Sequence, residues 1–200
     1  MNHLAHALLA APEPAPRLGN LFGDAVRGPL SRQDLPAGVL DGVKAHRRID
    51  AMTDRHPDTL HMRGLFPDAL RRYAGIILDL AFDHYLVRQW PQFCEISRRS
   101  FTLEVYGAMQ HYPALLPPSI RAVAPEMIAR DFLNRCETVG GLTSALTHID
   151  RRLSRGFDVE LARQTLLAHD ATFQRGFESV YSDVRAALVS SQQLSGQAPA

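Results

Sequence analysis

The sequence predicts an all-α fold, and two features of its apolar residues indicate that class. Apolar side chains recur at helical spacing along most of the 200 residues, and no segment shows the strict alternation of a half-buried strand. Leucine and alanine also far outnumber valine and isoleucine, which strands favour. With 46% hydrophobic residues and no internal repeat or linker, residues 1–190 are expected to form one compact domain. The polar end, residues 191–200, is expected to be disordered.

Two short helices are predicted at the start of the chain. Residues 1–11 carry His3 and His6 on one side and are followed by three closely spaced prolines. Residues 15–28 turn a leucine-rich side to the core and end at a glycine and a proline. The opposite side of this second helix is expected to carry Asn20, Asp24 and Arg27.

The next predicted helix spans residues 35–55 and ends before Pro57. A short piece over residues 58–65 follows it. The longer helix combines an apolar stripe with a polar end on one face. That face carries Val39, Val43, His46, Asp50 and, near its edge, Asp54.

A long central helix is predicted to begin near Pro67, to include residues 70–90 and to end at Trp90 and Pro91. Its apolar stripe consists of Tyr73, Ile76, Leu80 and Val87. Asp79 and Asp83, one turn apart, fall within that stripe, and His84 lies beside them. Acidic residues at such positions require an explanation.

Further helical periodicity covers the second half of the chain. Breaks are predicted at proline and glycine clusters, and Pro125 is expected to kink or split one helix. Another break is expected near His169. The predicted segments are 95–111, 118–137, 142–155 and 159–188.

Composition excludes several classes of protein. The formal charge is +1, from 22 basic and 21 acidic residues, and gives no general attraction to nucleic acid or to an acidic membrane. No apolar stretch approaches the roughly 20 residues that cross a bilayer. Cys94 and Cys136 are too few for a disulfide framework, and no secretory leader opens the sequence, so we expect a cytoplasmic protein.

The buried carboxylates predict a divalent metal centre. Two like charges in an apolar stripe persist only with a cation, a shared proton or strong donors. Carboxylate oxygen with some imidazole nitrogen suits Mn²⁺ or Mg²⁺, with a slight preference for Mn²⁺ because of the imidazole. The candidate residues are Asp24, His46, Asp50, Asp79, Asp83 and His84.

Structural alternatives exist for each of these residues. Asp79 and Asp83 could form buried ion pairs with Arg47 or Arg48, and Asp24 could pair with Arg27. His3 and His6 are more typical of core or surface histidines than of ligands, although their helix could close one side of a metal pocket. Arg47 and Arg48 are equally suited to hold a phosphate oxygen beside a metal, because guanidinium presents a planar fork of donors.

Four motifs together resemble the acyl carrier protein phosphodiesterase family: MNHLAHALLA, GNLFGDAVRG, AHRRIDAMTD and LDLAFDHYL. The likeness is strong over about the first ninety residues and weaker beyond them. That family is similar to HD-domain phosphohydrolases, which are all-helical metal enzymes. Here the adjacent pair is reversed, as Asp83-His84, so the usual ligand order does not apply.

The resemblance implies hydrolysis of holo-acyl carrier protein, with release of 4′-phosphopantetheine and formation of the apo form, and a preference for Mn²⁺. On that hypothesis Asp24, His46, Asp79 and Asp83 lie closest to the metal, and Asp50 is a further ligand or orients one. His84 is a ligand or a general acid for the leaving serine oxygen. Arg27, Arg47 and Arg48 would hold phosphate. Other arginine pairs would form an encounter surface for the acidic carrier.

Two other functions are compatible with the sequence. One is an HD-type phosphohydrolase that acts on a nucleotide or a small phosphate ester. The other is a non-enzymatic helical module that binds an acidic protein partner, in which the carboxylates form only ion pairs.

Overall fold

The structure, a computed structural model, describes the backbone of residues 1–195 and the side chains of residues 1–190. Every regular element in that part is helical, which confirms the all-α class. The α-helices are α1 (His3–Leu9), α2 (Pro14–Leu21), α3 (Ala37–Arg55), α4 (Pro57–Gly64), α5 (Ala74–Arg88), α6 (Trp90–Phe93), α7 (Arg98–His111), α8 (Pro118–Ala129), α9 (Val139–Asp150), α10 (Val159–Ala168) and α11 (Asp170–Ser195). Short 3₁₀ helices are η1 (Gly23–Ala25), η2 (Leu30–Arg32), η3 (Asp68–Tyr73) and η4 (Pro113–Leu115).

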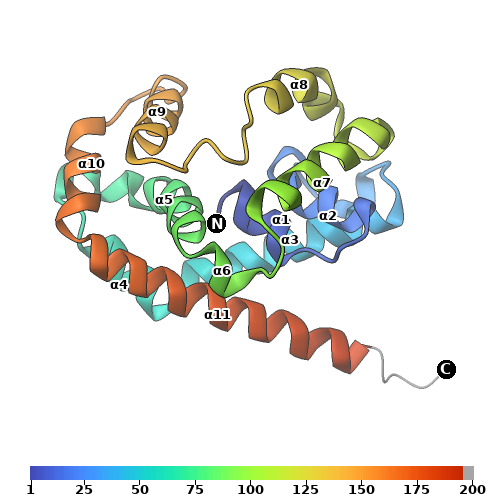
Figure 1. Ribbon diagram of the computed structural model, residues 1–200, viewed down its shortest axis with the longest axis horizontal. Helices are drawn as coiled ribbons and strands as arrows, with labels where there is room; N and C mark the ends of the chain where they lie inside the picture. The colour runs from blue at the N-terminus through green and yellow to red at the C-terminus, as the bar shows by residue number, and fades with distance from the viewer. Residues whose placement is uncertain (196–200) are drawn as a thin grey trace.

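The helices enclose one apolar core, and α5 lies deep within it. Ten of the 15 residues of α5 are buried, including both Asp83 and His84. Long α11 runs along one side of the molecule, and α8 and α9 lie on the opposite side (Figure 1). The N-terminus and α1 lie between these layers, so the first helix reaches the interior.

Helices α2 and α3 approach so closely that glycine is required at their contact. A Cβ atom on Gly19 would lie 2.2 Å from the carbonyl oxygen of Val39, and one on Gly42 would lie 2.2 Å from that of Pro16. Both obstacles are backbone atoms, which cannot rotate away. This contact fixes the relative position of two helices that carry polar residues of the candidate site.

The predicted central helix is divided in the structure. Its first turns form the 3₁₀ helix η3, and α5 ends at Arg88. Trp90 begins the short helix α6 instead of ending the preceding helix, with Pro91 in its first turn, where a missing amide hydrogen costs little. The predicted break near His169 is confirmed, because α10 ends there and α11 follows.

The prediction of a helix over residues 118–137 was wrong in its second half. Pro125 lies inside α8 without splitting it, but α8 ends at Ala129. Asp131 then adopts a positive φ of 48°, which a continuing right-handed helix excludes. The hydroxyl of Tyr106 donates to the Asp131 carboxylate at 2.7 Å and accepts from the Leu133 amide at 2.9 Å. Residues 130–138 are therefore an irregular connection held by side-chain hydrogen bonds.

The end of the chain is only partly described. Helix α11 continues to Ser195, which includes the first residues of the segment for which we expected disorder. The rest of that prediction, residues 196–200, lies outside the described part. Among the helices that the structure describes, none has both the length and the apolar character that a membrane crossing requires.

Candidate metal centre

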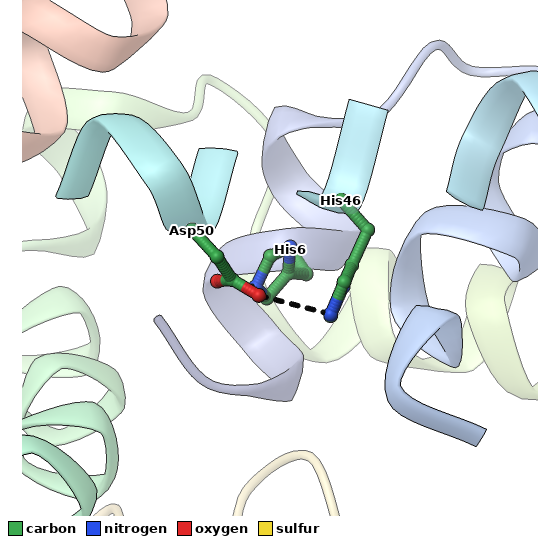
Figure 2. A group of neighbouring side chains, drawn as sticks. All are labelled: His6, His46 and Asp50. Carbon is green, nitrogen blue, oxygen red and sulfur yellow. Dashed lines mark hydrogen bonds and ion pairs between the residues drawn. The ribbon is translucent and has the colours of Figure 1, made fainter. Parts of the chain in front are cut away.

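Two imidazoles and one carboxylate converge where α1 meets α3 (Figure 2). His6 comes from α1, whereas His46 and Asp50 lie one turn apart on α3. Nε2 of His6 is 3.0 Å from Oδ1 of Asp50, and Nε2 of His46 is 3.1 Å from Oδ2 of the same carboxylate. One ligand atom from each of the three residues lies within 4.8 Å of the others. Such a set of nitrogen and oxygen donors suits a divalent transition-metal ion.

Asn20 on α2 orients both imidazole rings. Its backbone oxygen accepts a hydrogen bond from Nδ1 of His46 at 2.8 Å, and its side-chain oxygen lies 2.9 Å from Nδ1 of His6. Metal-binding histidines are commonly held in this way, with the second ring nitrogen bonded to a protein oxygen. The prediction that Asn20 faces away from the core was wrong, because α1 and α3 pack against α2 and leave Asn20 fully buried.

The surroundings of His46 favour a positive charge at its Nε2 atom. Nδ1 of His46 faces a backbone carbonyl and must carry hydrogen, so in the neutral ring Nε2 presents a lone pair to two carboxylates. Burial alone would lower the pKa of His46, but the hydrogen bonds and charges of Asp24 and Asp50 outweigh it and raise that pKa to about 9. In the absence of metal a proton occupies Nε2. A divalent cation bound at this nitrogen would replace that proton.

The other two members of the group differ in charge. Burial lowers the pKa of His6, despite the neighbouring Asp50 carboxylate, so this imidazole is neutral. Burial would raise the pKa of Asp50, but the hydrogen bond from His46, the contact with His6 and the charge of the Met1 amino group reverse the effect and lower it. The two rings stack with centroids 4.0 Å apart, an arrangement that disfavours a positive charge on both. The group therefore combines a neutral imidazole with an ionised carboxylate, as metal coordination requires.

Asp24 forms the exposed edge of the group. Its Oδ1 lies 3.1 Å from Nε2 of His46, and that hydrogen bond lowers the pKa of the Asp24 carboxyl group. Its side chain is 92% exposed, so it connects the buried imidazoles with solvent. A Cβ atom on the preceding residue, Gly23, would lie 2.4 Å from Cγ of His46. Glycine at this position thus lets the His46 ring pack against the backbone of η1.

Asp79 lies near the group and contacts the amino group of Met1. That nitrogen is 3.1 Å from Oδ1 of Asp79 and 3.3 Å from Oδ1 of Asp50. Burial would lower the pKa of the amino group, but the two carboxylates outweigh it and raise that pKa. The amino group of Met1 therefore bridges the carboxylates of Asp79 and Asp50.

Asp83 holds α1 in place by accepting hydrogen bonds from its backbone. The amide nitrogens of Leu4 and Ala5 donate to its two carboxylate oxygens, each at 3.1 Å. Burial raises the pKa of Asp83 to about 6, although these two amides oppose the shift. Asp83 thus fixes the helix that supplies His6, and both of its oxygens already have backbone partners.

Replacing Asp83 by asparagine is expected to change the pH dependence of stability. Because the folded-state pKa lies above the ordinary value of 3.8, the stabilisation from this group is complete below that value and is lost as the pH rises to about 6. As the pH is raised from 4 to 7, the unfolding free energy of Asp83→Asn should rise relative to that of wild type by roughly 2 kcal/mol. Urea unfolding at several pH values measures this difference, with Asp68→Asn at an exposed position as the control. A constant difference between Asp83→Asn and wild type would contradict the prediction.

The comparison with known proteins gives the family. A model of the acyl carrier protein phosphodiesterase family matches residues 1–184. The chain belongs to this family.

Relatives with the same family name match between about half and nine tenths of the chain. The acyl carrier protein phosphodiesterase of Photorhabdus laumondii subsp. laumondii is 30% identical over 182 residues, which are 90% of this chain and 91% of that protein. The acyl carrier protein phosphodiesterase of Serratia proteamaculans is 39% identical over 119 residues, 59% of this chain and 61% of that protein. The protein of that name from Pectobacterium atrosepticum is 41% identical over 92 residues, 46% of this chain and 47% of its own length. No solved structure matches the chain.

In this member of the acyl carrier protein phosphodiesterase family, His84 points away from the His6–His46–Asp50 group. Its Nδ1 lies 2.8 Å from the backbone oxygen of Cys136 and donates to it. Burial lowers the pKa of His84, so the imidazole is neutral. Its contact therefore ties α5 to the irregular segment 130–138.

The three arginines that were expected to bind phosphate lie in three different environments. Arg47 donates to the backbone oxygens of Val26 and Gly28, at 2.9 and 2.8 Å, and thereby fixes the loop after η1. Arg48 lies on the other side of α3 and faces α11, with a 3.4 Å contact to the Ala187 oxygen. Arg27 is exposed. Among the described side chains, none of the ion pairs considered as alternatives for Asp24, Asp79 and Asp83 is present.

The sequence did not predict the roles of His6, a member of the group, and of Asn20, which holds its two imidazoles. His6 was interpreted as a core or surface histidine, and Asn20 as an outward-facing residue. The available signal was the opening motif, in which His3 and His6 are the only polar residues of a short helix. Since α1 has only 7 residues, its orientation depends on Asp83 and on packing rather than on its own pattern.

Proposed function

We propose that this protein is a metal-dependent phosphodiesterase that hydrolyses holo-acyl carrier protein to the apo form and 4′-phosphopantetheine. The observation that supports this most strongly is the convergence of His6, His46 and Asp50 in a chain of the acyl carrier protein phosphodiesterase family. Family membership favours this reaction over a nucleotide phosphohydrolase and over a non-enzymatic module. The cytoplasmic location expected from the sequence is part of the same proposal.

The three converging residues fit a divalent cation, and we assign them as its ligands, with Asp24 as a further oxygen donor at the exposed edge. When bound, such a cation supplies Lewis-acid activation of water and of the phosphoryl oxygen. The mixture of imidazole and carboxylate donors favours Mn²⁺ over Mg²⁺, which prefers oxygen alone. Of the residues expected from the sequence, this assignment keeps Asp24, His46 and Asp50 and adds His6.

The remaining predicted residues take supporting roles in this proposal. Asp83 fixes α1, and Asp79 holds the Met1 amino group beside Asp50. His84 anchors the segment 130–138. Asn20 keeps both Nε2 atoms directed at the ion by engaging both Nδ1 atoms.

The reaction is tested directly by mass spectrometry. Purified protein is incubated with holo-carrier and Mn²⁺, with a chelator-treated sample and a Mg²⁺ sample in parallel. The expected result is loss of the phosphopantetheine mass from the carrier only when the metal is present. Unchanged holo-carrier in the Mn²⁺ sample would refute the proposed function.

A further inference from the structure

The segment 130–138 covers the side of α1 that carries His3. In Figure 1 it crosses from α8 to α9 above the N-terminus. The Phe132 ring lies edge-on to the His3 ring, with centroids 5.6 Å apart, and also stacks on Phe22 at 6.1 Å. The backbone oxygen of Cys136 accepts the hydrogen bond from His84. The segment therefore contacts α1, which supplies His6, and α5, which holds α1 through Asp83.

Side-chain contacts fix this segment although it is not helical. Tyr106 on α7 binds both Asp131 and the Leu133 amide. Arg98, also on α7, donates to the side chains of Asn134 and Glu137. A residue between these anchors is thus held in a defined place, as a residue that binds a ligand must be.

Arg135 occupies that place, between Phe132 and Cys136. It is partly exposed, and no carboxylate among the described side chains lies within 4.0 Å of it. Its charge reaches two buried groups: burial and then Arg135 lower the pKa of His3 to about 3, and Arg135 also opposes the burial effect on Asp83. Phe132, three positions before Arg135, packs on His3, and His3 lies one turn before His6 on α1. The segment that carries Arg135 therefore borders the helix that supplies a candidate metal ligand.

We propose that Arg135 binds the phosphate of the phosphodiester substrate beside the metal centre. This inference rests on the proposed function and assigns a substrate-binding residue to it. A phosphodiester carries a negative charge, and guanidinium binds two of its oxygens through a planar pair of donors. Arg47 is bonded to two backbone oxygens and Arg48 faces α11, whereas Arg135 lies on a segment that packs on α1.

The proposal is tested first by binding, without turnover. Thermal unfolding is measured with Mn²⁺ alone and with Mn²⁺ plus inorganic phosphate, for wild type, Arg135→Gln and Arg135→Lys. The control is Arg130→Gln, an exposed arginine that pairs with Glu126 in the same region. In wild type and in the control, Mn²⁺ should raise the unfolding temperature, and phosphate should raise it further. Arg135→Gln should keep the Mn²⁺ shift, which shows an intact centre, and lose the phosphate shift.

Kinetics supply the second readout. Arg135→Gln should reduce kcat/KM for holo-carrier about 10- to 100-fold, as expected for lost charge-assisted hydrogen bonds, and added guanidinium should restore part of it. Arg135→Lys should be intermediate, which keeps the test decisive if the glutamine variant does not fold. If Arg135→Gln had the same phosphate-induced rise in unfolding temperature and the same kcat/KM as wild type, the proposal would be overturned. An inactive wild type would instead refute the proposed function, and the phosphate shift would still test Arg135.

Discussion

Replacing Asp50 by asparagine is expected to abolish divalent-metal binding and to lower holo-carrier hydrolysis by at least about 100-fold. The amide keeps the shape of the carboxylate but removes the negative charge that lies 3.0 Å from His6 and 3.1 Å from His46. Loss of groups that only orient metal ligands already costs about 10- to 100-fold. Removal of a proposed ligand should therefore cost more.

Thermal unfolding separates this effect from misfolding. At a Mn²⁺ concentration about 100 times the dissociation constant, binding should stabilise wild type by about 2.7 kcal/mol, or roughly 5–10 °C in a chain of this size. Asp50→Asn should unfold cooperatively but show no Mn²⁺ shift. Asp54→Asn, one turn further along α3 and paired with Arg63 at 2.6 Å, is the matched control and should retain the shift. A normal shift and a normal rate in Asp50→Asn would remove Asp50 from the site.

Replacing Gly42 by alanine should have the largest effect on stability. The new Cβ atom would lie 2.2 Å from the Pro16 oxygen and 2.7 Å from the Asn20 nitrogen, so α2 must move away from α3. Overpacking of this kind costs about 3 kcal/mol and outweighs the gain in helix propensity, which is below about 1 kcal/mol. Since Asn20 orients both imidazoles, we also expect weaker Mn²⁺ binding. Urea unfolding and Mn²⁺ titration measure the two effects.

The same substitution at Gly107 is the control for the change at Gly42. Gly107 lies inside α7, and the nearest atom to an added Cβ, Nδ1 of His111, is 4.0 Å away. Gly107→Ala should therefore stabilise the protein by about 0.5–1 kcal/mol. If Gly42→Ala were as stable as Gly107→Ala, the close approach of α2 and α3 would be in doubt.

The sequence predicted the fold class because helix formation leaves a local signal. Pro57 stops α3 next to its observed end at Arg55, and the break near His169 separates α10 from α11. The irregular segment 130–138 was not predicted, since its conformation depends on Tyr106, which is distant in sequence. Local periodicity contains no information about such a partner.

The site was predicted only in part for a related reason. His46 and Asp50 lie one turn apart on a single helix, so their proximity follows from helical spacing. His6 joins them because α1 packs against α2 and α5 and because Asp83 accepts hydrogen bonds from the start of α1. The buried position of Asp83 was thus correctly predicted, whereas its backbone partners on α1 depend on tertiary structure.

The most direct test of the metal centre is an anomalous-difference map from crystals of the protein grown with Mn²⁺. The account predicts that the strongest peak lies between Nε2 of His6, Nε2 of His46 and the Asp50 carboxylate, with the Asp24 side chain at its exposed edge. A strongest peak elsewhere, or no peak here in crystals of a protein whose activity requires Mn²⁺, would contradict it.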